Sequence, residues 1–397
     1  MNRSSLVGVA LACGALVACT AILSQAGPID PPAGPVGPTY RTLLEVEPRV
    51  PINLTNTPGD ADSLYKITQP GSYYLTGNVA GVANKVGIEI AASGVTIDLG
   101  GFELVGVGPG GGSYAGIFAS VPGLAGITVR NGTTRGWAGA GVDLSSVLAC
   151  RVDRVGAGAN AGTGIVAGDG AVVVDCVAWG NGGSGILAQN GGAIRGCTAR
   201  DNAGSGIVGA FVSVLNCTAS ENGESGFWVS NGSSIVGSTA RENVAHGIRA
   251  IHSTVSDCSV WDNGVGILAD QGTLVDGCTV IRSEGDGIEA GGECVLRGNS
   301  CRENGISTTG AGIHITGNDN RLEGNHCTNA DFGIWVQGTT NVIVHNTCAG
   351  NTANWLLGVN NIYGGIIDRT TVTSAGVSGN AAAASTATSD PNANFSH

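Results

Sequence analysis

Residues 197–228 read CTARDNAGSGIVGAFVSVLNCTASENGESGFW, and this stretch contains two copies of one pattern. Each copy has a cysteine, an asparagine five residues later, and then a glycine followed by a large apolar residue. The first copy begins at Cys197 and the second at Cys217, an offset of 20 residues. A fixed offset of this length indicates a repeat architecture, in which one short unit stacks on the next.

The pattern extends over most of the chain. The glycine step recurs at Gly87, Gly116, Gly141, Gly164, Gly185, Gly206, Gly226, Gly247, Gly266, Gly287, Gly312 and Gly333, with a degraded copy at Asn354-Trp355. The cysteine marker falls at Cys176, Cys197, Cys217, Ser238, Cys258 and Cys278, and its register continues at Asn299, Asn325 and Asn346. The asparagine marker falls at Asn181, Asn202, Asn222, Asn243, Asn263, Asn304 and Asn351.

This period predicts the fold. A unit of about 21 residues that contains several glycines is too short for two helices, and a leucine-rich repeat would need an L-x-x-L-x-L pattern that is absent. Short strands bury their apolar face when coils stack about 4.8 Å apart, so that like residues lie on like residues. We therefore expect an all-β, single-stranded right-handed parallel β-helix of roughly 11–13 coils. Stacked asparagines should bond to each other at a bend, and glycine should supply the positive φ of the corners.

The cysteines allow two interpretations. Adjacent coils bring cysteines close enough for disulfides in an exported protein. However, cysteine alternates with serine and asparagine at one coil position, which favours buried, unbridged thiols.

Composition limits the partners. The 397 residues carry a formal net charge of −12, and the only lysines are Lys66 and Lys85. An acidic chain without basic clusters argues against nucleic acids and anionic membranes as partners. No apolar run after residue 26 approaches the length of a membrane span.

The chain divides into four predicted regions. Residues 1–26 have the features of a secretory signal peptide, with Ser24-Gln25-Ala26 as the cleavage site. Lipidation at Cys19 is the alternative, and either interpretation predicts an exported protein. Residues 27–59 form a Pro-rich arm or N-terminal cap, residues 60–368 the β-helix, and residues 369–397 a low-complexity tail that could end in a docked Phe395.

These coils resemble the pectin-lyase-like right-handed β-helix superfamily. The stretch 94–104, GVTIDLGGFEL, is similar to the opening coil of such proteins, and CTARDN at 197–202 followed by Gly206-Ile207 matches their internal repeats. The arm 27–51 resembles leaders of planctomycete members that are described only as β-helix repeat proteins. The resemblance covers about residues 60–368 and implies the fold. It leaves activity open, because the superfamily holds lyases, glycosidases and adhesins.

A candidate binding face follows from the strand geometry. The residue after each Gly-Ile step should point outward, which gives the stripe Val166, Leu187, Val208, Trp228, Arg249, Leu268, Glu289, His314, Trp335 and Leu356. Within it, we expect Trp228, Arg249, Glu289, His314 and Trp335 to stack on and hydrogen-bond a sugar chain. The alternative is that loops or the tail cover this face. A second stripe, Trp179, Arg200, Ser220, Arg241, Trp261, Ile281 and Arg302, has acids beside it and favours a solvated ion-pair lattice.

Catalysis is not supported by any complete motif. A polygalacturonase-like enzyme would need adjacent aspartates, Gly-His-Gly and Arg-Ile-Lys, and these are absent. The weak candidates are Asp286 and Glu289 as an acid–base pair, with Arg249 and His314 near them. We expect no metal site: Met1 is the only methionine, the six histidines form no compact set, and calcium lacks positive support.

Three functions remain open from the sequence. The leading hypothesis is an exported, non-catalytic β-helix that binds a polysaccharide or cell-envelope partner. The second is a polysaccharide lyase or glycoside hydrolase, and the third is a structural or adhesion module. Oligomeric state cannot be inferred.

Overall fold

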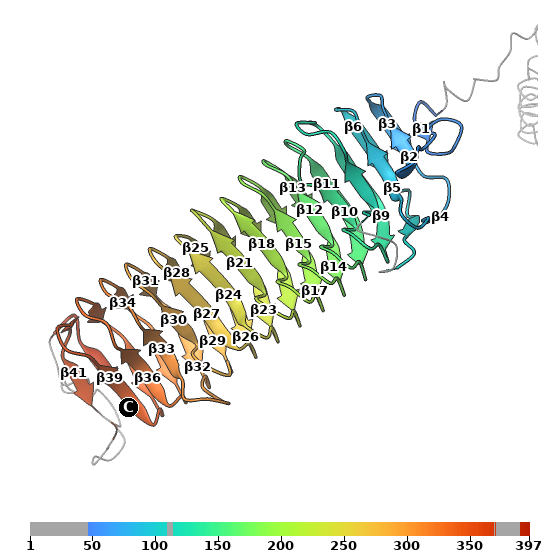
Figure 1. Cartoon of the computed structure of the whole chain (residues 1–397). Coiled ribbons are helices and arrows are strands. Elements are labelled where there is room, and N and C mark those ends of the chain that lie inside the picture. Colours follow the sequence, from blue (N-terminus) through green and yellow to red (C-terminus); the bar gives the residue numbers. More distant parts are fainter. Residues whose placement is uncertain (1–46, 109–113, 369, 371–389) are drawn as a thin grey trace, which may run out of the picture. The chain divides into compact units, whose positions relative to one another are not determined.

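The computed structural model describes residues 47–108, 114–368, 370 and 390–397. Within them the chain forms strands β1 to β42 and no helix, so the described residues contain no helix that could cross a membrane. Residues 49–397 form one compact unit, in which the strands stack in successive coils (Figure 1). The predicted signal peptide, Cys19 and most of the Pro-rich arm lie outside the described residues.

Each coil contributes one strand to a 14-stranded parallel sheet, called sheet B here. Its strands are β2 (Ser63–Ile67), β5 (Val86–Ile90), β8 (Ile117–Ala119), β10 (Val142–Leu144), β12 (Ile165–Ala167), β15 (Ile186–Ala188), β18 (Ile207–Ala210), β21 (Phe227–Ser230), β24 (His246–Ile251), β27 (Val265–Asp270), β30 (Ile288–Ala290), β33 (Ala311–Ile315), β36 (Phe332–Val336) and β39 (Ala353–Leu357). The predicted 11–13 coils become 14 because β2 precedes the first glycine step.

The other strands belong to a 28-stranded sheet, sheet A, which holds two columns of strands joined by the long strands β9 (Thr128–Arg135) and β11 (Arg151–Gly158). The first column contains β1 (Val50–Pro51), β3 (Gly71–Tyr74), β6 (Val95–Asp98), β13 (Val172–Val174), β16 (Ala193–Arg195), β19 (Ser213–Leu215), β22 (Ser234–Val236), β25 (Thr254–Ser256), β28 (Leu274–Asp276), β31 (Val295–Arg297), β34 (Arg321–Glu323), β37 (Val342–Val344) and β40 (Ile362–Tyr363). The second contains β4 (Val79–Ala80), β7 (Glu103–Val105), β14 (Val177–Trp179), β17 (Thr198–Arg200), β20 (Thr218–Ser220), β23 (Thr239–Arg241), β26 (Ser259–Trp261), β29 (Thr279–Ile281), β32 (Ser300–Arg302), β35 (His326–Thr328), β38 (Thr347–Ala349), β42 (Asn394–Ser396) and β41 (Ile366–Asp368).

The core consists of apolar residues stacked on their own copies. In sheet B, Ile165 pairs with Ile186 and Ile186 with Ile207, and all three side chains are fully buried. The residue between each pair of inward side chains points out, because successive residues of a strand face opposite sides of the sheet. The repeat length thereby sets both the core and the outer face.

Asparagine ladders hold the coils in register. Asn202 donates from its Nδ2 to Oδ1 of Asn222 at 3.0 Å, and Asn222 donates to Asn243 at 2.9 Å. The backbone N–H of each asparagine also donates to the Oδ1 of the next. The side chains are buried, so each amide forms the hydrogen bonds that the backbone of the bend cannot form with water. The predicted stacking of the asparagine marker is confirmed.

The step glycines have a different role from the glycines at the corners. A Cβ on Gly206 would lie 2.6 Å from the carbonyl oxygen of Gly226 and 2.8 Å from Nδ2 of Asn222, so a side chain has no room. Positive φ occurs at the corners, where glycines such as Gly196 alternate with Asp175 and Asn216. The step glycine is therefore required for close approach to the asparagine ladder, while the expected positive φ of corner glycines is confirmed at positions such as Gly196.

The cysteine marker forms one column. The backbone N–H of Cys197 faces Sγ of Cys217 at 3.4 Å, and that of Cys217 donates to the hydroxyl of Ser238 at 3.2 Å. In the next coil, the backbone N–H of Ser259 donates to the carbonyl of Ser238. Cys258 directly precedes Ser259 and therefore continues the same column. All ten described cysteines are buried free thiols, as the alternation with serine indicated.

Both ends of the described β-helix differ from the predicted regions. Val50–Pro51 lies within the predicted arm, yet it forms β1 and pairs with β3. Asn394–Ser396 lies within the predicted tail, yet it forms β42 between β38 and β41, and Asn394 accepts from the backbone N–H of Asn346. Asparagine at 394 extends the ladder of Asn299, Asn325 and Asn346, which explains why this segment returns to the sheet.

We predict that Asn222→Ala destabilises the protein by about 1–3 kcal/mol, because Asn202 loses the acceptor for two buried N–H groups. Denaturant unfolding followed by circular dichroism measures the loss. Asn190→Ala is the matched control, since Asn190 is exposed and bonds only at the surface. Equal effects of the two substitutions would contradict a stabilising role for the ladder.

Candidate functional site

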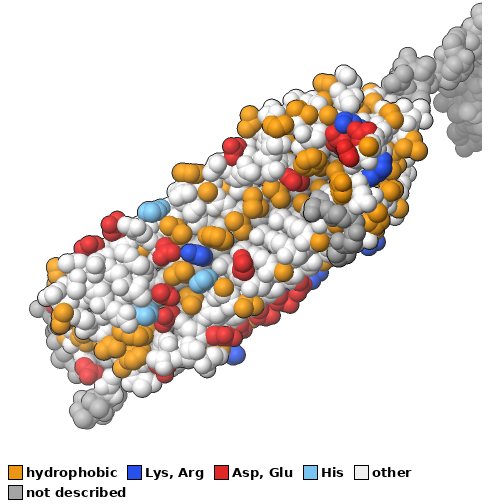
Figure 2. Space-filling model, viewed as in Figure 1, with side chains coloured by type: hydrophobic (Ala, Val, Ile, Leu, Met, Phe, Trp, Pro, Cys, Tyr) orange, Lys and Arg blue, Asp and Glu red, His pale blue; other side chains and the backbone are white. Residues whose placement is uncertain are grey.

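The predicted outward stripe is one continuous column on sheet B. The strand register pairs its members in order: Val166, Leu187, Val208, Trp228, Arg249, Leu268, Glu289, His314, Trp335 and Leu356. Trp228 is 39% exposed and Leu356 is also exposed, so no described loop covers these two positions. Figure 2 shows hydrophobic side chains gathered along this face, with acidic, basic and histidine side chains between them.

His314 is the most constrained member of the column. Its Nδ1 lies 2.8 Å from Oδ2 of Asp286, and Oδ1 of the same carboxylate accepts from the backbone N–H of Ala311 at 2.7 Å. The imidazole stacks on Trp335 with ring centroids 4.0 Å apart and planes 7° apart. His314 is only 9% exposed, and its buried Nε2 has no hydrogen-bond partner among the described residues. The carboxylate and the indole therefore fix the ring and leave Nε2 buried without a partner among the described residues.

Glu289 precedes His314 in the column. Burial raises the pKa of the Glu289 carboxyl, and the nearby charge of Asp286 raises it further, while His314 acts in the opposite direction. The shift favours the protonated carboxyl, which can donate a hydrogen bond. Asp286, Glu289 and His314 thus combine two carboxyl groups and an imidazole within two adjacent coils.

Arg249 lies two coils away from Glu289. Its guanidinium lies 5.2 Å from the ring centroid of Trp228 and 4.0 Å from a carboxylate oxygen of Asp270. The buried Nε of Arg249 has no partner among the described residues. Beside it, Nδ1 of His246 lies 3.2 Å from the hydroxyl of Ser225. Burial, followed by the charge of Arg249, lowers the pKa of His246.

The sequence pattern did not identify the polar residues beside the column or the first members of the column. Asp270 and His246 occupy other outward positions of the same strands, so aligning a second and third coil position would have found them. The outward column also begins earlier than the predicted stripe, at Lys66, Glu89, Phe118 and Asp143. The glycine step itself identifies the last three of these, because Glu89, Phe118 and Asp143 each follow one by two residues.

The second predicted stripe is also a column, on sheet A. Its arginines pair with neighbouring acids, for example Arg200 with Asp201 at 2.7 Å and Arg241 with Glu242 at 2.8 Å. Such exposed pairs contribute little free energy. Among the described residues, no group of three or more His, Cys, Asp or Glu side chains is arranged to hold a metal ion.

The family described as "Right handed beta helix region" matches residues 111–245 and 141–275. The chain is a right-handed parallel β-helix. The predicted resemblance to the pectin-lyase-like superfamily is therefore confirmed at the level of the fold. A second family, "Periplasmic copper-binding protein (NosD)", matches residues 249–380 of this β-helix. No curated protein matches the sequence.

Two solved structures share the fold of the β-helix. The A-module of mannuronan C-5 epimerase AlgE4 from Azotobacter vinelandii has a TM-score of 0.53 and 16% identity, over 74% of this chain and 91% of that one. The A-module of AlgE6 from the same organism has a TM-score of 0.52 and 18% identity, over 74% and 89%. At these identities the likeness shows the fold alone.

We predict that the stability difference between Glu289→Gln and the native protein depends on pH. A raised pKa means that the folded state binds more protons than the unfolded state, so this group lowers stability as pH rises above its ordinary value of 4.5. Glutamine does not titrate, so the variant does not lose this stability as the pH rises. Its unfolding free energy relative to the native protein should therefore increase from pH 4.5 upward and then level off, as measured by urea unfolding at several pH values. A difference that stays constant with pH would contradict the shift.

Proposed function

We propose that this β-helix is an exported protein that binds a polysaccharide along the outer face of sheet B, between Trp228 and Trp335. The observation that carries the proposal is the column itself. Two aromatic side chains lie at the ends of a row that contains Arg249, Glu289 and His314, and two buried polar atoms in that row have no partner among the described residues.

The chemistry of a sugar chain fits this row. Aromatic rings cover the apolar faces of sugar rings, while a few well-placed polar groups fix the hydroxyls. Trp228 and Trp335 are five coils apart, which corresponds to about 24 Å at the stacking distance. An extended chain can therefore contact both indoles at once, and the polar side chains lie between them.

Two further observations support the proposal. AlgE4 and AlgE6 modules, which share the fold, are epimerases of the polysaccharide mannuronan by name. Residues 1–26 have the composition of a secretory signal, and this supports export to a compartment where polysaccharides of the cell envelope are accessible. A purely structural or adhesive role would require no glycan affinity.

We predict that Trp228→Ala and Trp335→Ala each weaken polysaccharide binding roughly tenfold, because each removes one stacking surface. Affinity electrophoresis and calorimetry against alginates, neutral glucans and envelope polysaccharides measure the change. Trp261→Ala is the matched control, since Trp261 is 37% exposed, close to the 39% of Trp228, but lies on sheet A. Equal weakening by all three variants, or no affinity of the native protein for any polysaccharide, would exclude the proposed face.

A second candidate function is acid–base catalysis on the bound chain. It is favoured by one observation: Asp286 orients His314, whose Nε2 is unoccupied, beside a carboxyl with a raised pKa. An imidazole held in this way can accept a proton from the substrate while the protonated carboxyl of Glu289 donates one. The pairing matches the chemistry of glycan cleavage or epimerisation.

The expected outcome for this candidate is activity that depends on both groups. The native protein should convert a polysaccharide, seen as unsaturated uronides, new reducing ends or a changed C-5 configuration by NMR. His314→Gln and Glu289→Gln should each lower that rate at least a hundredfold while binding persists. Binding without any product from the native protein would leave the binding function and remove the catalytic one.

A further inference from the structure

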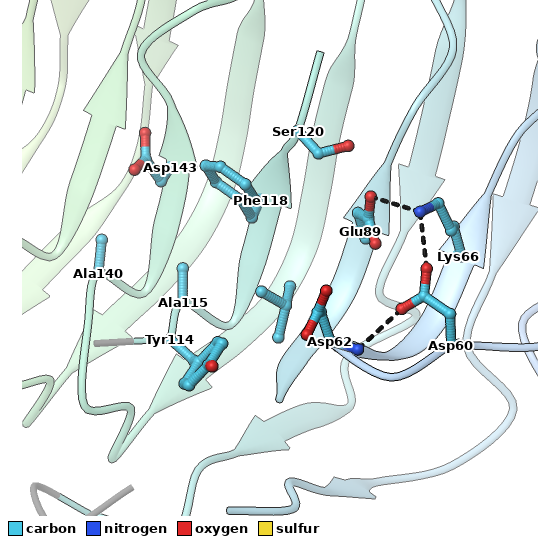
Figure 3. Close-up of a pocket in the computed structure, with 11 residues that line it drawn as sticks. Asp60, Asp62, Lys66, Glu89, Tyr114, Ala115, Phe118, Ser120, Ala140 and Asp143 are labelled. Atoms are coloured by element: carbon cyan, nitrogen blue, oxygen red, sulfur yellow. Dashed lines mark hydrogen bonds and ion pairs between the residues drawn. The ribbon is translucent and has the colours of Figure 1, made fainter. Parts of the chain in front are cut away.

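A separate pocket lies at the N-terminal end of the same face. It has a volume of about 380 Å³, within the range of small-ligand sites. Four successive members of the outward column, Lys66, Glu89, Phe118 and Asp143, line it from β2, β5, β8 and β10. Figure 3 shows Lys66 and Glu89 on one side, Asp143 on the other, and Phe118 between them.

The single cation of this pocket is already engaged. Nζ of Lys66 lies 2.7 Å from Oδ2 of Asp60 and 2.8 Å from Oε1 of Glu89, and Glu89 is only 8% exposed. The hydrogen bond from Lys66 lowers the pKa of Asp60, and the bond to Asp60 raises the pKa of Lys66. Asp60 and Lys66 therefore stay charged, and the ammonium, which contacts two carboxylates, is not available to an anionic ligand.

The remaining carboxylates face the pocket without a counter-ion. Asp62 and Asp143 form no ion pair with any residue that the structure describes, although Oδ1 of Asp143 accepts from the backbone N–H of Ser145 at 3.0 Å. Four carboxylates against one ammonium give the lining a formal charge of −3 (1 − 4). The pocket consequently repels uronates and attracts a cation.

The walls restrict which cation fits. Phe118 and Tyr114 are partly exposed and supply aromatic surface, and Ser120 adds a hydroxyl. A bare metal ion would gain nothing from aromatic walls, and the described residues contain no group arranged to hold one. A ring that carries hydroxyls, an apolar face and an ammonium group matches all three kinds of wall.

We propose that this pocket binds a protonated amino sugar. The proposal rests on the proposed function, because the same column runs from Asp143 through Val166, Leu187 and Val208 to Trp228. Asp143 and Trp228 are four coils apart, which corresponds to about 19 Å at the stacking distance, and the apolar residues between them form the floor. The polysaccharide that lies along sheet B thus contains amino sugars, and one of them occupies the pocket.

The test uses short oligosaccharides on the full chain. A trimer of β-1,4-linked glucosamine should bind to the native protein in calorimetry at a pH where its amines are protonated, and the N-acetylated trimer should bind at least tenfold more weakly. The double variant Asp62→Asn/Asp143→Asn and the single variant Phe118→Ala should each weaken binding of the glucosamine trimer at least tenfold. Trp261→Ala, on sheet A and outside the column, should leave it unchanged.

A charge-matched control separates local recognition from the net charge of the protein. Asp201→Asn/Asp257→Asn removes two exposed carboxylates from turns of sheet A, where asparagine tolerates the positive φ. This variant should bind the glucosamine trimer as the native protein does. Circular dichroism confirms that each variant is folded.

Several outcomes would overturn the proposal. Equal affinity for the N-acetylated trimer, equal affinity for spermidine, or no effect of the Asp62/Asp143 substitutions would each exclude an amino-sugar site. If the glucosamine trimer fails to bind while a long polysaccharide binds in a Trp228-dependent way, the pocket assignment fails and the proposed function stands. If neither binds, both fail.

Discussion

The hydrogen bond between one asparagine amide and the next is the interaction on which this structure depends. Backbone ladders alone tolerate a shift of register between parallel strands, because every residue offers the same N–H and C=O groups. A buried amide that lacks its acceptor costs free energy, so Asn202, Asn222 and Asn243 define one alignment of the coils. The step glycines are part of the same arrangement, because a side chain at these positions would keep the coil from approaching the asparagine amides.

That alignment converts distance along the sequence into proximity in space. Residues 20 or 21 positions apart become neighbours, so a surface is built by choosing one residue per coil. The polar region from Arg249 to Trp335 and the pocket from Lys66 to Asp143 are two segments of a single column. A ligand that is itself a repeating polymer is the natural partner for such a surface, because its units can match successive coils.

The fold and the column were predictable from the sequence, whereas the pairings within the site were not. Periodicity assigns Trp228, Glu289 and His314 to one face, because each follows a glycine step. It cannot show that Asp286 reaches back to His314 or that His314 stacks on Trp335, since these contacts depend on side-chain rotamers. The pocket near Lys66 was not predicted, because its first strand, β2, precedes the first glycine step. The docking of Phe395 was expected, whereas the strand that contains it was not predicted, because only one asparagine, Asn394, links this strand to a ladder.

The position of β42 has a consequence for how the chain is made. This strand follows β41 in the sequence, yet it lies between β38 and β41, with ladder bonds on both sides. During synthesis β38 and β41 emerge first and leave a gap of one strand between them. The terminal coil can therefore close only after residues 394–396 have been synthesised, and until then the growing end exposes unpaired strand edges to any neighbouring polypeptide.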